Sequence, residues 1–148
     1  MEWLKKLFSK EIQTIGFEDV KIALASSEYI FINTLSTMEQ ECLIAKTVSF
    51  DKEEAVINQL LEKGHKESIA IIVYGKHSAD TSVLAKRAQL RNLGFGAVYI
   101  YGGGLFEWLL LQEIYGAAEF PTMGKCADLL KYRPVPIFQR TFSLRLGL

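Results

Sequence analysis

The chain has 148 residues, the usual size of one domain, which is enough to bury a core without disulfides or a structural metal. Its 17 basic and 17 acidic residues cancel, which argues against a general electrostatic affinity for nucleic acid or for an anionic membrane surface. The two cysteines, Cys42 and Cys126, match no metal-ligand spacing and are too few for a disulfide scaffold, so a reducing, cytoplasmic compartment is expected.

The beginning of the chain is too short and too charged for a signal peptide, and no apolar run approaches the length of a membrane span. Its apolar residues recur at helical spacing: Trp3, Leu4, Leu7, Phe8 and Ile12. This pattern predicts an N-terminal amphipathic helix that packs on the protein's own core, and a helix lying on a membrane or a partner is the alternative.

Short apolar runs then alternate with longer periodic segments, as parallel strands joined by crossover helices require. The runs at 29–33, 69–74 and 97–101 are continuous rather than alternating, which predicts strands covered on both faces. A weaker strand candidate lies at 46–50.

Three helices are expected between and after these strands. The first, at 53–63, has a capping-box-like start in Asp51 and Glu54. The second carries its apolar residues from position 83 to 93, with Asp80 or Thr81 as its cap and Gly94 as its exit.

The third helix, at 105–115, is apolar almost all round and is therefore expected to be mostly buried. A short helix at 126–132 follows, and Pro134 and Pro136 then break regular structure. We expect one domain over 1–136, including the N-terminal helix, and a tail over 137–148 that is apolar and basic.

The segment between the most hydrophobic strand and the second helix is the first candidate site. Ligands of an open parallel sheet collect beyond the carboxyl ends of its strands, and backbone amides at a helix start suit an anion. The candidate anion-binding loop consists of Gly75, Lys76, His77, Ser78, Ala79, Asp80, Thr81 and Ser82.

The motifs around this loop resemble those of the rhodanese-like superfamily. In order and spacing they are Val73-Tyr74-Gly75, the loop to Ser82, a helix ending in Gly94-Phe95, a strand at 98–101, and Gly103-Gly104-Leu105-Phe106-Glu107-Trp108. The family has a Val-Tyr-Cys type signature, a cradle loop, and a Gly-Gly-x-x-x-Trp motif at these places. The resemblance covers 18–108 and implies an α/β, three-layer fold with a central parallel β-sheet flanked by helices.

This chain departs from the family where the chemistry takes place. Active members use a loop cysteine, as thiolate, to accept the transferred sulfur. The matching position is Gly75, which has no nucleophile, so a persulfide cannot form there. The loop's arginine is also missing, and Asn33 and Leu35 replace a charged Asp and Arg.

Three functions remain open. The first is a non-catalytic rhodanese-like module that binds an unidentified protein partner, or a second copy of itself, through the tail and the emptied site. The second is a binder of an anion or a phosphorylated ligand, which uses the loop amides with help from Lys76 and His77. The third is a sulfurtransferase or phosphatase-like enzyme with a relocated nucleophile, a thiol or a hydroxyl of Ser78 or Thr81 beside His77.

Other motifs predict structural roles. Gly103 and Gly104 lack the full dinucleotide or Walker patterns, and close packing of the helix that carries Trp108 explains them better. Both cysteines are expected to be buried and inert, Cys126 within a helix. We expect no cofactor, no metal, no nucleic-acid partner and no membrane span.

Overall fold

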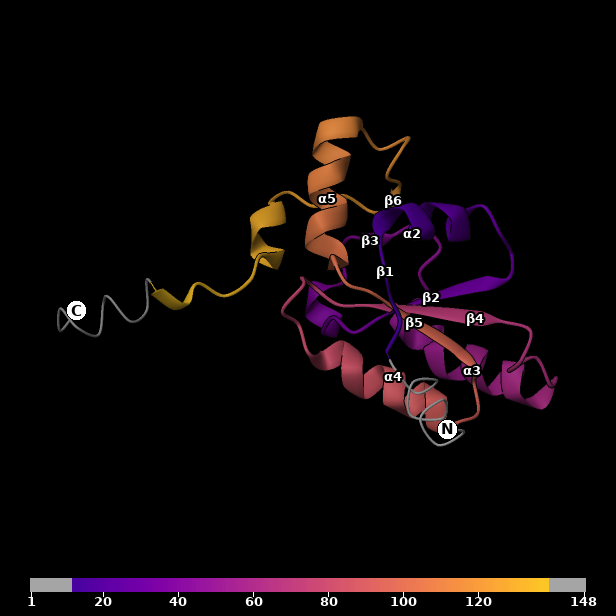
Figure 1. The fold of residues 1–148 in the computed structure, drawn as a ribbon. Coiled ribbons are helices and arrows are strands. Elements are labelled where there is room, and N and C mark those ends of the chain that lie inside the picture. The colour runs from indigo at the N-terminus through magenta and orange to yellow at the C-terminus, as the bar shows by residue number, and fades with distance from the viewer. Residues whose placement is uncertain (1–11, 139–148) are drawn as a thin grey trace, which may run out of the picture.

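Four parallel strands form one sheet in the order β1-β5-β4-β2 (Figure 1). The computed structural model describes residues 12–138. The strands span Thr14–Ile15 (β1), Tyr29–Asn33 (β2), Ala70–Tyr74 (β4) and Ala97–Tyr101 (β5). Asn33 pairs with Tyr74, and Ile15 pairs with Tyr101, so the carboxyl ends of these strands lie at one edge of the sheet.

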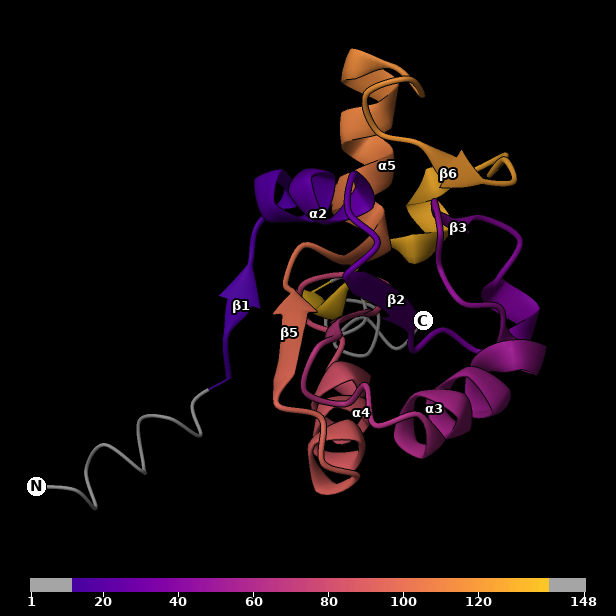
Figure 2. The same cartoon turned by 90° about the vertical axis from the view of Figure 1, so that its right-hand side faces the viewer.

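Helices cover both faces of the sheet. Figures 1 and 2 show α2 (Phe17–Leu24) and α5 (Gly104–Tyr115) on one face, and α3 (Glu53–Glu62) and α4 (Ser82–Asn92) on the other. The predicted three-layer α/β fold is confirmed.

The side chains of β4 divide the core into two parts. Ile72 and Tyr74 belong to the cluster that contains Trp108, on the α2 and α5 side. Ile71 and Val73 belong to the cluster on the α3 and α4 side. Because successive side chains of a strand point to opposite faces, a strand covered on both faces must be apolar throughout.

A second, two-stranded antiparallel sheet joins β3 (Leu43–Ile44) to β6 (Thr122–Met123). The weaker strand predicted at 46–50 is wrong. Lys46 turns the chain at a φ of 66°, Thr47 makes only an isolated bridge to Phe31, and the 3-10 helix η2 (Phe50–Lys52) follows.

The predicted caps are confirmed in one case and wrong in another. Asp80 accepts a hydrogen bond from the Ser82 amide at the start of α4, whereas Thr81 makes no side-chain cap. The capping box at Asp51 is wrong, because η2 leads directly into α3 with no side-chain cap.

Two predicted helices differ in extent or burial. The helix expected at 126–132 is only the 3-10 turn η3 (Leu129–Tyr132), capped by Asp128, so Cys126 lies in an irregular segment before it. The last turn of α5 projects beyond the sheet (Figure 1), and Ile114 and Tyr115 are 70% and 63% exposed there, so the expectation of a mostly buried helix is wrong for this turn.

Some elements had no clear sequence signal, namely β1, α2 and β6. They are short, and α2 buries only Val20 and Ala23. The N-terminal helix predicted before Ile12 and most of the tail predicted at 137–148 lie outside the described residues. Among the described helices, none has the length and apolar character needed to cross a membrane.

Candidate functional site

The loop from Gly75 to Ser82 lies at the carboxyl edge of the sheet, between β4 and α4. The Thr34 amide donates to the Tyr74 carbonyl (3.0 Å), which joins the end of β2 to the last residue before the loop. The same edge contains the start of α5, so three segments distant in sequence meet there (Figure 1). The structure therefore brings the sequence-predicted loop and the Gly103-Gly104 motif together.

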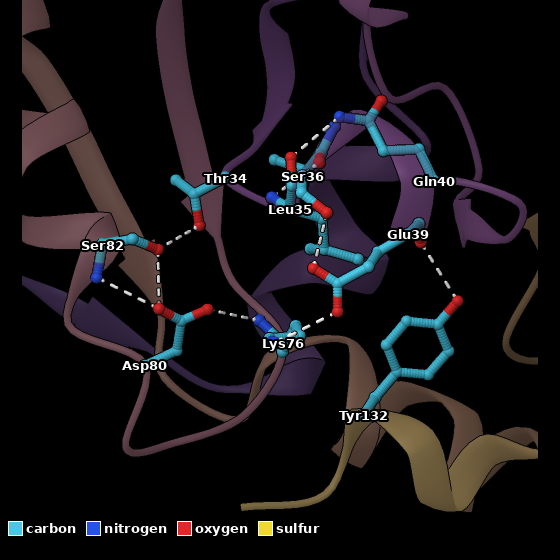
Figure 3. A network of polar contacts seen from close by, with 10 residues as sticks. Thr34, Leu35, Ser36, Glu39, Gln40, Lys76, Asp80, Ser82 and Tyr132 are labelled. Atoms are coloured by element: carbon cyan, nitrogen blue, oxygen red, sulfur yellow. Dashed lines mark hydrogen bonds and ion pairs between the residues drawn. The ribbon is translucent and has the colours of Figure 1, made fainter.

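The Asp80 carboxylate occupies the inside of this loop (Figure 3). Its Oδ2 accepts the Lys76 amide (2.9 Å), and its Oδ1 accepts the amide (3.1 Å) and the hydroxyl (2.6 Å) of Ser82. An aspartate with these partners is an anion that the chain itself supplies to the loop amides.

The pKa of Asp80 lies below its ordinary value. Burial alone raises the pKa, but hydrogen bonds from the Lys76 amide and from Ser82, together with the charge of His77, outweigh it. The carboxylate is therefore ionised at neutral pH.

Gly75 lies directly against this carboxylate. A Cβ built at Gly75 would lie 2.5 Å from Asp80 Oδ2 and 3.1 Å from Thr34 Oγ1. The first separation is shorter than a van der Waals contact, so a side chain at position 75 and the Asp80 carboxylate cannot both keep these places.

Lys76, the cation of the loop, is directed away from it. Its Nζ lies 3.1 Å from Glu39 Oε2, on the 3-10 helix η1 (Thr37–Glu39), and Figure 3 shows this pair beside Tyr132. Tyr132 is buried and donates its hydroxyl hydrogen to the Glu39 carbonyl (3.1 Å). The lysine that was expected to assist an anion thus fixes the loop to η1.

His77 is not paired with a hydroxyl nucleophile. Its Nδ1 accepts the Ala79 amide (3.1 Å), and its carbonyl accepts the Asp80 amide (3.1 Å). The Ser82 hydroxyl contacts Asp80 and Thr34 instead. Within residues 12–138, no hydrogen bond joins His77 to the hydroxyl of Ser78 or Thr81.

Gly104 allows the start of α5 to touch the loop backbone. It has a φ of 68°, and a Cβ there would lie 2.9 Å from both the Gly75 carbonyl oxygen and the His77 nitrogen. The amides of Leu105 and Phe106 donate to the carbonyls of Gly75 (2.9 Å) and Lys76 (2.8 Å). These amides are among the first of α5, which have no partner within the helix itself.

Trp108 anchors the same helix from the other side. It is fully buried, and its Nε1 donates to the Pro121 carbonyl (3.0 Å). Its ring makes an edge contact with Phe120, with centroids 5.0 Å apart. The glycine-rich motif and its tryptophan thus position α5 against the loop.

The two thiols contact other parts of the protein. Cys42 is buried beside β3 and contacts the Gly124 carbonyl at 3.8 Å, and burial raises its pKa. Cys126 is only partly buried, so the expectation of a buried thiol is wrong there, and it contacts Glu41 Oε1 at 3.9 Å. Within residues 12–138, no group of three or more His, Cys, Asp or Glu side chains is placed to hold a metal ion.

Asn33, one of the residues that depart from the family pattern, has a structural role. Asn33 is buried, and its Oδ1 accepts the Leu35 amide (3.0 Å), which closes a turn at the end of β2. The sequence predicts Asp80 as a helix cap and as a member of the candidate anion-binding loop, but not that its carboxylate fills this loop. Its position five residues after Gly75 was the available signal, because an Asp inside a short loop readily accepts the loop's own amides.

Comparison with known proteins identifies the fold. No family model matches the chain, and no curated protein matches its sequence. Among solved structures, BH2092 from Bacillus halodurans has a TM-score of 0.63 at 19% identity, over 95% of this chain and 97% of that one. The single-domain sulfurtransferase RDL2 from Saccharomyces cerevisiae has a TM-score of 0.53 at 15% identity, over 76% of this chain and 98% of that one.

The chain has a rhodanese-like fold. An EanB variant, whose structure contains ergothioneine covalently linked with a cysteine persulfide, matches with a TM-score of 0.55 at 16% identity. The match covers 93% of this chain and 33% of that one. In the rhodanese-like fold of the present chain, the loop that the resemblance aligns with the sulfur-accepting cysteine carries Gly75 and encloses Asp80.

Proposed function

We propose that this chain is a non-catalytic rhodanese-like module whose role is to bind a protein partner or to serve as a structural or regulatory domain. The observation that carries the proposal is the Asp80 carboxylate, which accepts the Lys76 and Ser82 amides directly in front of Gly75. Position 75 then lacks a nucleophile, and the amides of Lys76 and Ser82 are used by an internal anion.

Asp80 also weakens the two alternatives. An external phosphate or sulfate would have to displace a carboxylate with three hydrogen bonds, and a second anion beside it would be repelled. A relocated thiol would have to act from Cys42 or Cys126, whose contacts are with Gly124 and Glu41. Among the described residues, no contact specifically favours either alternative.

Exposed apolar side chains support the binding role. Ile114 and Tyr115 lie at the projecting end of α5, and Val135, Ile137 and Phe138 are 66%, 71% and 89% exposed near the end of the described chain. Large apolar side chains exposed at these two places favour association with another protein.

The catalytic half of the proposal is tested with thiosulfate and with 3-mercaptopyruvate as sulfur donors and cyanide as acceptor. We expect no turnover above a mock purification and no persulfide in the intact mass of the protein. The matched control is the Cys126→Ser variant. Turnover by the wild type that Cys126→Ser abolishes would establish a relocated nucleophile and overturn the proposal.

The binding half is tested by affinity capture from the native cell. The wild type is compared with a variant that carries Ile114→Asp and Tyr115→Asp, and with a control that carries Ile22→Asp, an exposed residue of α2. We expect a partner that the wild type and the control retain and the α5 variant loses. Identical captures by all three would exclude the end of α5 as the binding surface.

A further inference from the structure

A hollow lies at the carboxyl edge of the sheet, between the end of β2 and α4. Its volume is about 360 Å³, which is within the range of small-molecule sites. Its walls come from the segment that follows β2, from η2 with the start of α3, and from one side of α4. The lining includes Asn33, Gln40, Phe50, Glu53, Lys86 and Gln89.

Asn33 brings an unused hydrogen-bond donor to this hollow. The residue is only 6% exposed, and its Oδ1 accepts the Leu35 amide at 3.0 Å. That bond fixes the side chain and leaves Nδ2 as its other end. Among the described residues, Nδ2 of Asn33 has no hydrogen-bond partner. Because a buried donor without an acceptor is costly, a ligand that supplies the acceptor here is favoured.

Two further carboxamides line the same hollow. Gln40 donates from Nε2 to the Leu35 carbonyl at 3.0 Å (Figure 3), and its Oε1 has no partner among the described residues. Gln89 is exposed on α4, and its side-chain amide makes no hydrogen bond within residues 12–138. The hydroxyls at this edge are engaged with each other, since Ser82 donates to Thr34 at 2.7 Å. The free polar groups are therefore amides, which offer donors and acceptors without charge.

The charged side chains of the hollow neutralise each other. Lys86 Nζ lies 3.0 Å from Glu53 Oε2, and no other residue of the lining is charged. A charged ligand therefore finds no unpaired counter-charge in these walls. Phe50, by contrast, is 66% exposed and offers an aromatic face to a ligand. Together these walls suit an uncharged, flat ligand with polar edges.

We propose that this hollow binds an uncharged nitrogen heterocycle of the nucleobase type that carries a ring carbonyl, as uridine and inosine do. The ring carbonyl accepts Nδ2 of Asn33, a ring N–H donates to a carboxamide oxygen of Gln40 or Gln89, and the ring stacks on Phe50. Asn and Gln side chains recognise bases through paired donors and acceptors, and aromatic side chains bind the faces of bases.

This ligand site goes beyond the proposed function. A sulfurtransferase assay does not report on the binding of a heterocycle, and this binding requires no nucleophile. The two proposals can therefore fail separately.

Titration of the full chain with uridine and with inosine, followed through the amide resonances, tests the site. We expect saturable shifts at residues 33–35 and 82–89 at millimolar ligand. Asn33→Asp keeps an acceptor for the Leu35 amide and removes the donor, so it should weaken binding about tenfold. Phe50→Ala removes the stacking face and should weaken binding about fivefold or more. Since Phe50 is exposed, this variant keeps the test valid if Asn33→Asp does not fold.

Ile22→Ala is the matched control, because Ile22 is equally exposed, at 66%, on α2 across the sheet. It should leave the affinity for uridine unchanged. Absence of saturable shifts in the wild type, or an unchanged affinity in either folded variant of the site, would overturn the proposal. So would an oligouridylate that binds far more tightly than uridine at low salt only, because this behaviour indicates a nucleic-acid strand as the ligand.

Discussion

Asp80 and Gly75 depend on each other: Oδ2 of Asp80 lies 2.5 Å from the place where a Cβ of residue 75 would be. The resemblance to rhodanese-like enzymes aligns this place with their sulfur-accepting side chain, and the proposed non-catalytic role rests on that alignment. Here the Asp80 carboxylate occupies the space that a side chain at position 75 would need. A side chain at position 75 and the present position of the Asp80 carboxylate therefore exclude each other.

The coupling can be measured with a double-mutant cycle. Gly75→Ala should lower the free energy of unfolding by about 1–3 kcal/mol, because the new methyl group displaces Asp80 from its hydrogen bonds. In an Asp80→Ala background the same change should cost at least about 0.5 kcal/mol less. Chemical denaturation gives all four values, with Gly96→Ala as a control, since a Cβ there meets nothing within 4 Å. Equal costs in both backgrounds would contradict the coupling.

Removal of the internal anion should create an anion site. In Asp80→Ala the amides of Lys76 and Ser82 lose their acceptor and face the loop interior. Titration with phosphate or sulfate to millimolar concentration should shift the amide resonances of residues 76–82 in this variant and leave those of the wild type in place. Chloride at equal ionic strength is the control. Shifts of equal size in the wild type would show that Asp80 does not block the loop.

Asp80 should also contribute to the pH dependence of stability. Its pKa is lower in the folded chain than the ordinary value of 3.8, so the folded state favours the ionised form. The contribution is complete above the unfolded pKa and is lost as the pH falls through the folded pKa. Denaturation between pH 6 and pH 3 should show a steeper loss of stability in the wild type than in Asp80→Asn. Parallel curves for the two proteins would contradict this.

Gly104 should tolerate substitution less than Gly64, although both have a positive φ, 68° and 72°. An alanine at either position bears the cost of the left-handed conformation, about 1–2 kcal/mol. At Gly104 the methyl group also meets the loop backbone at 2.9 Å, whereas at Gly64 it meets nothing within 4 Å. We expect Gly104→Ala to be less stable than Gly64→Ala by about 1–3 kcal/mol in thermal or chemical denaturation. Similar values would mean that α5 moves away from the loop at little cost.

The sequence was sufficient for the fold because its strongest signals are periodic and local. The strand that ends in Tyr74 is a continuous apolar run because both of its faces are buried. Gly94 follows the end of α4 because the chain there adopts a positive φ, which glycine tolerates best. The same reasoning could not find β1 or β6, because two-residue strands depend on pairing partners far away in the chain. Nor could it place the Asp80 carboxylate against Gly75, since that contact depends on how the loop folds back on itself.

The last prediction concerns the thiols, on which any relocated chemistry would depend. Cys42 is buried with a raised pKa, so it should react with a disulfide reagent such as dithionitrobenzoate only when the chain unfolds. Cys126 is partly exposed and should account for one fast equivalent at pH 8, which Cys126→Ser removes and Cys42→Ser preserves. Its rate should stay near that of glutathione, because its thiol contacts the Glu41 carboxylate, which is itself paired with Lys131, and does not lie at the start of an α-helix. A rate more than tenfold above glutathione would indicate an activated thiolate and would favour an enzyme over a non-catalytic module.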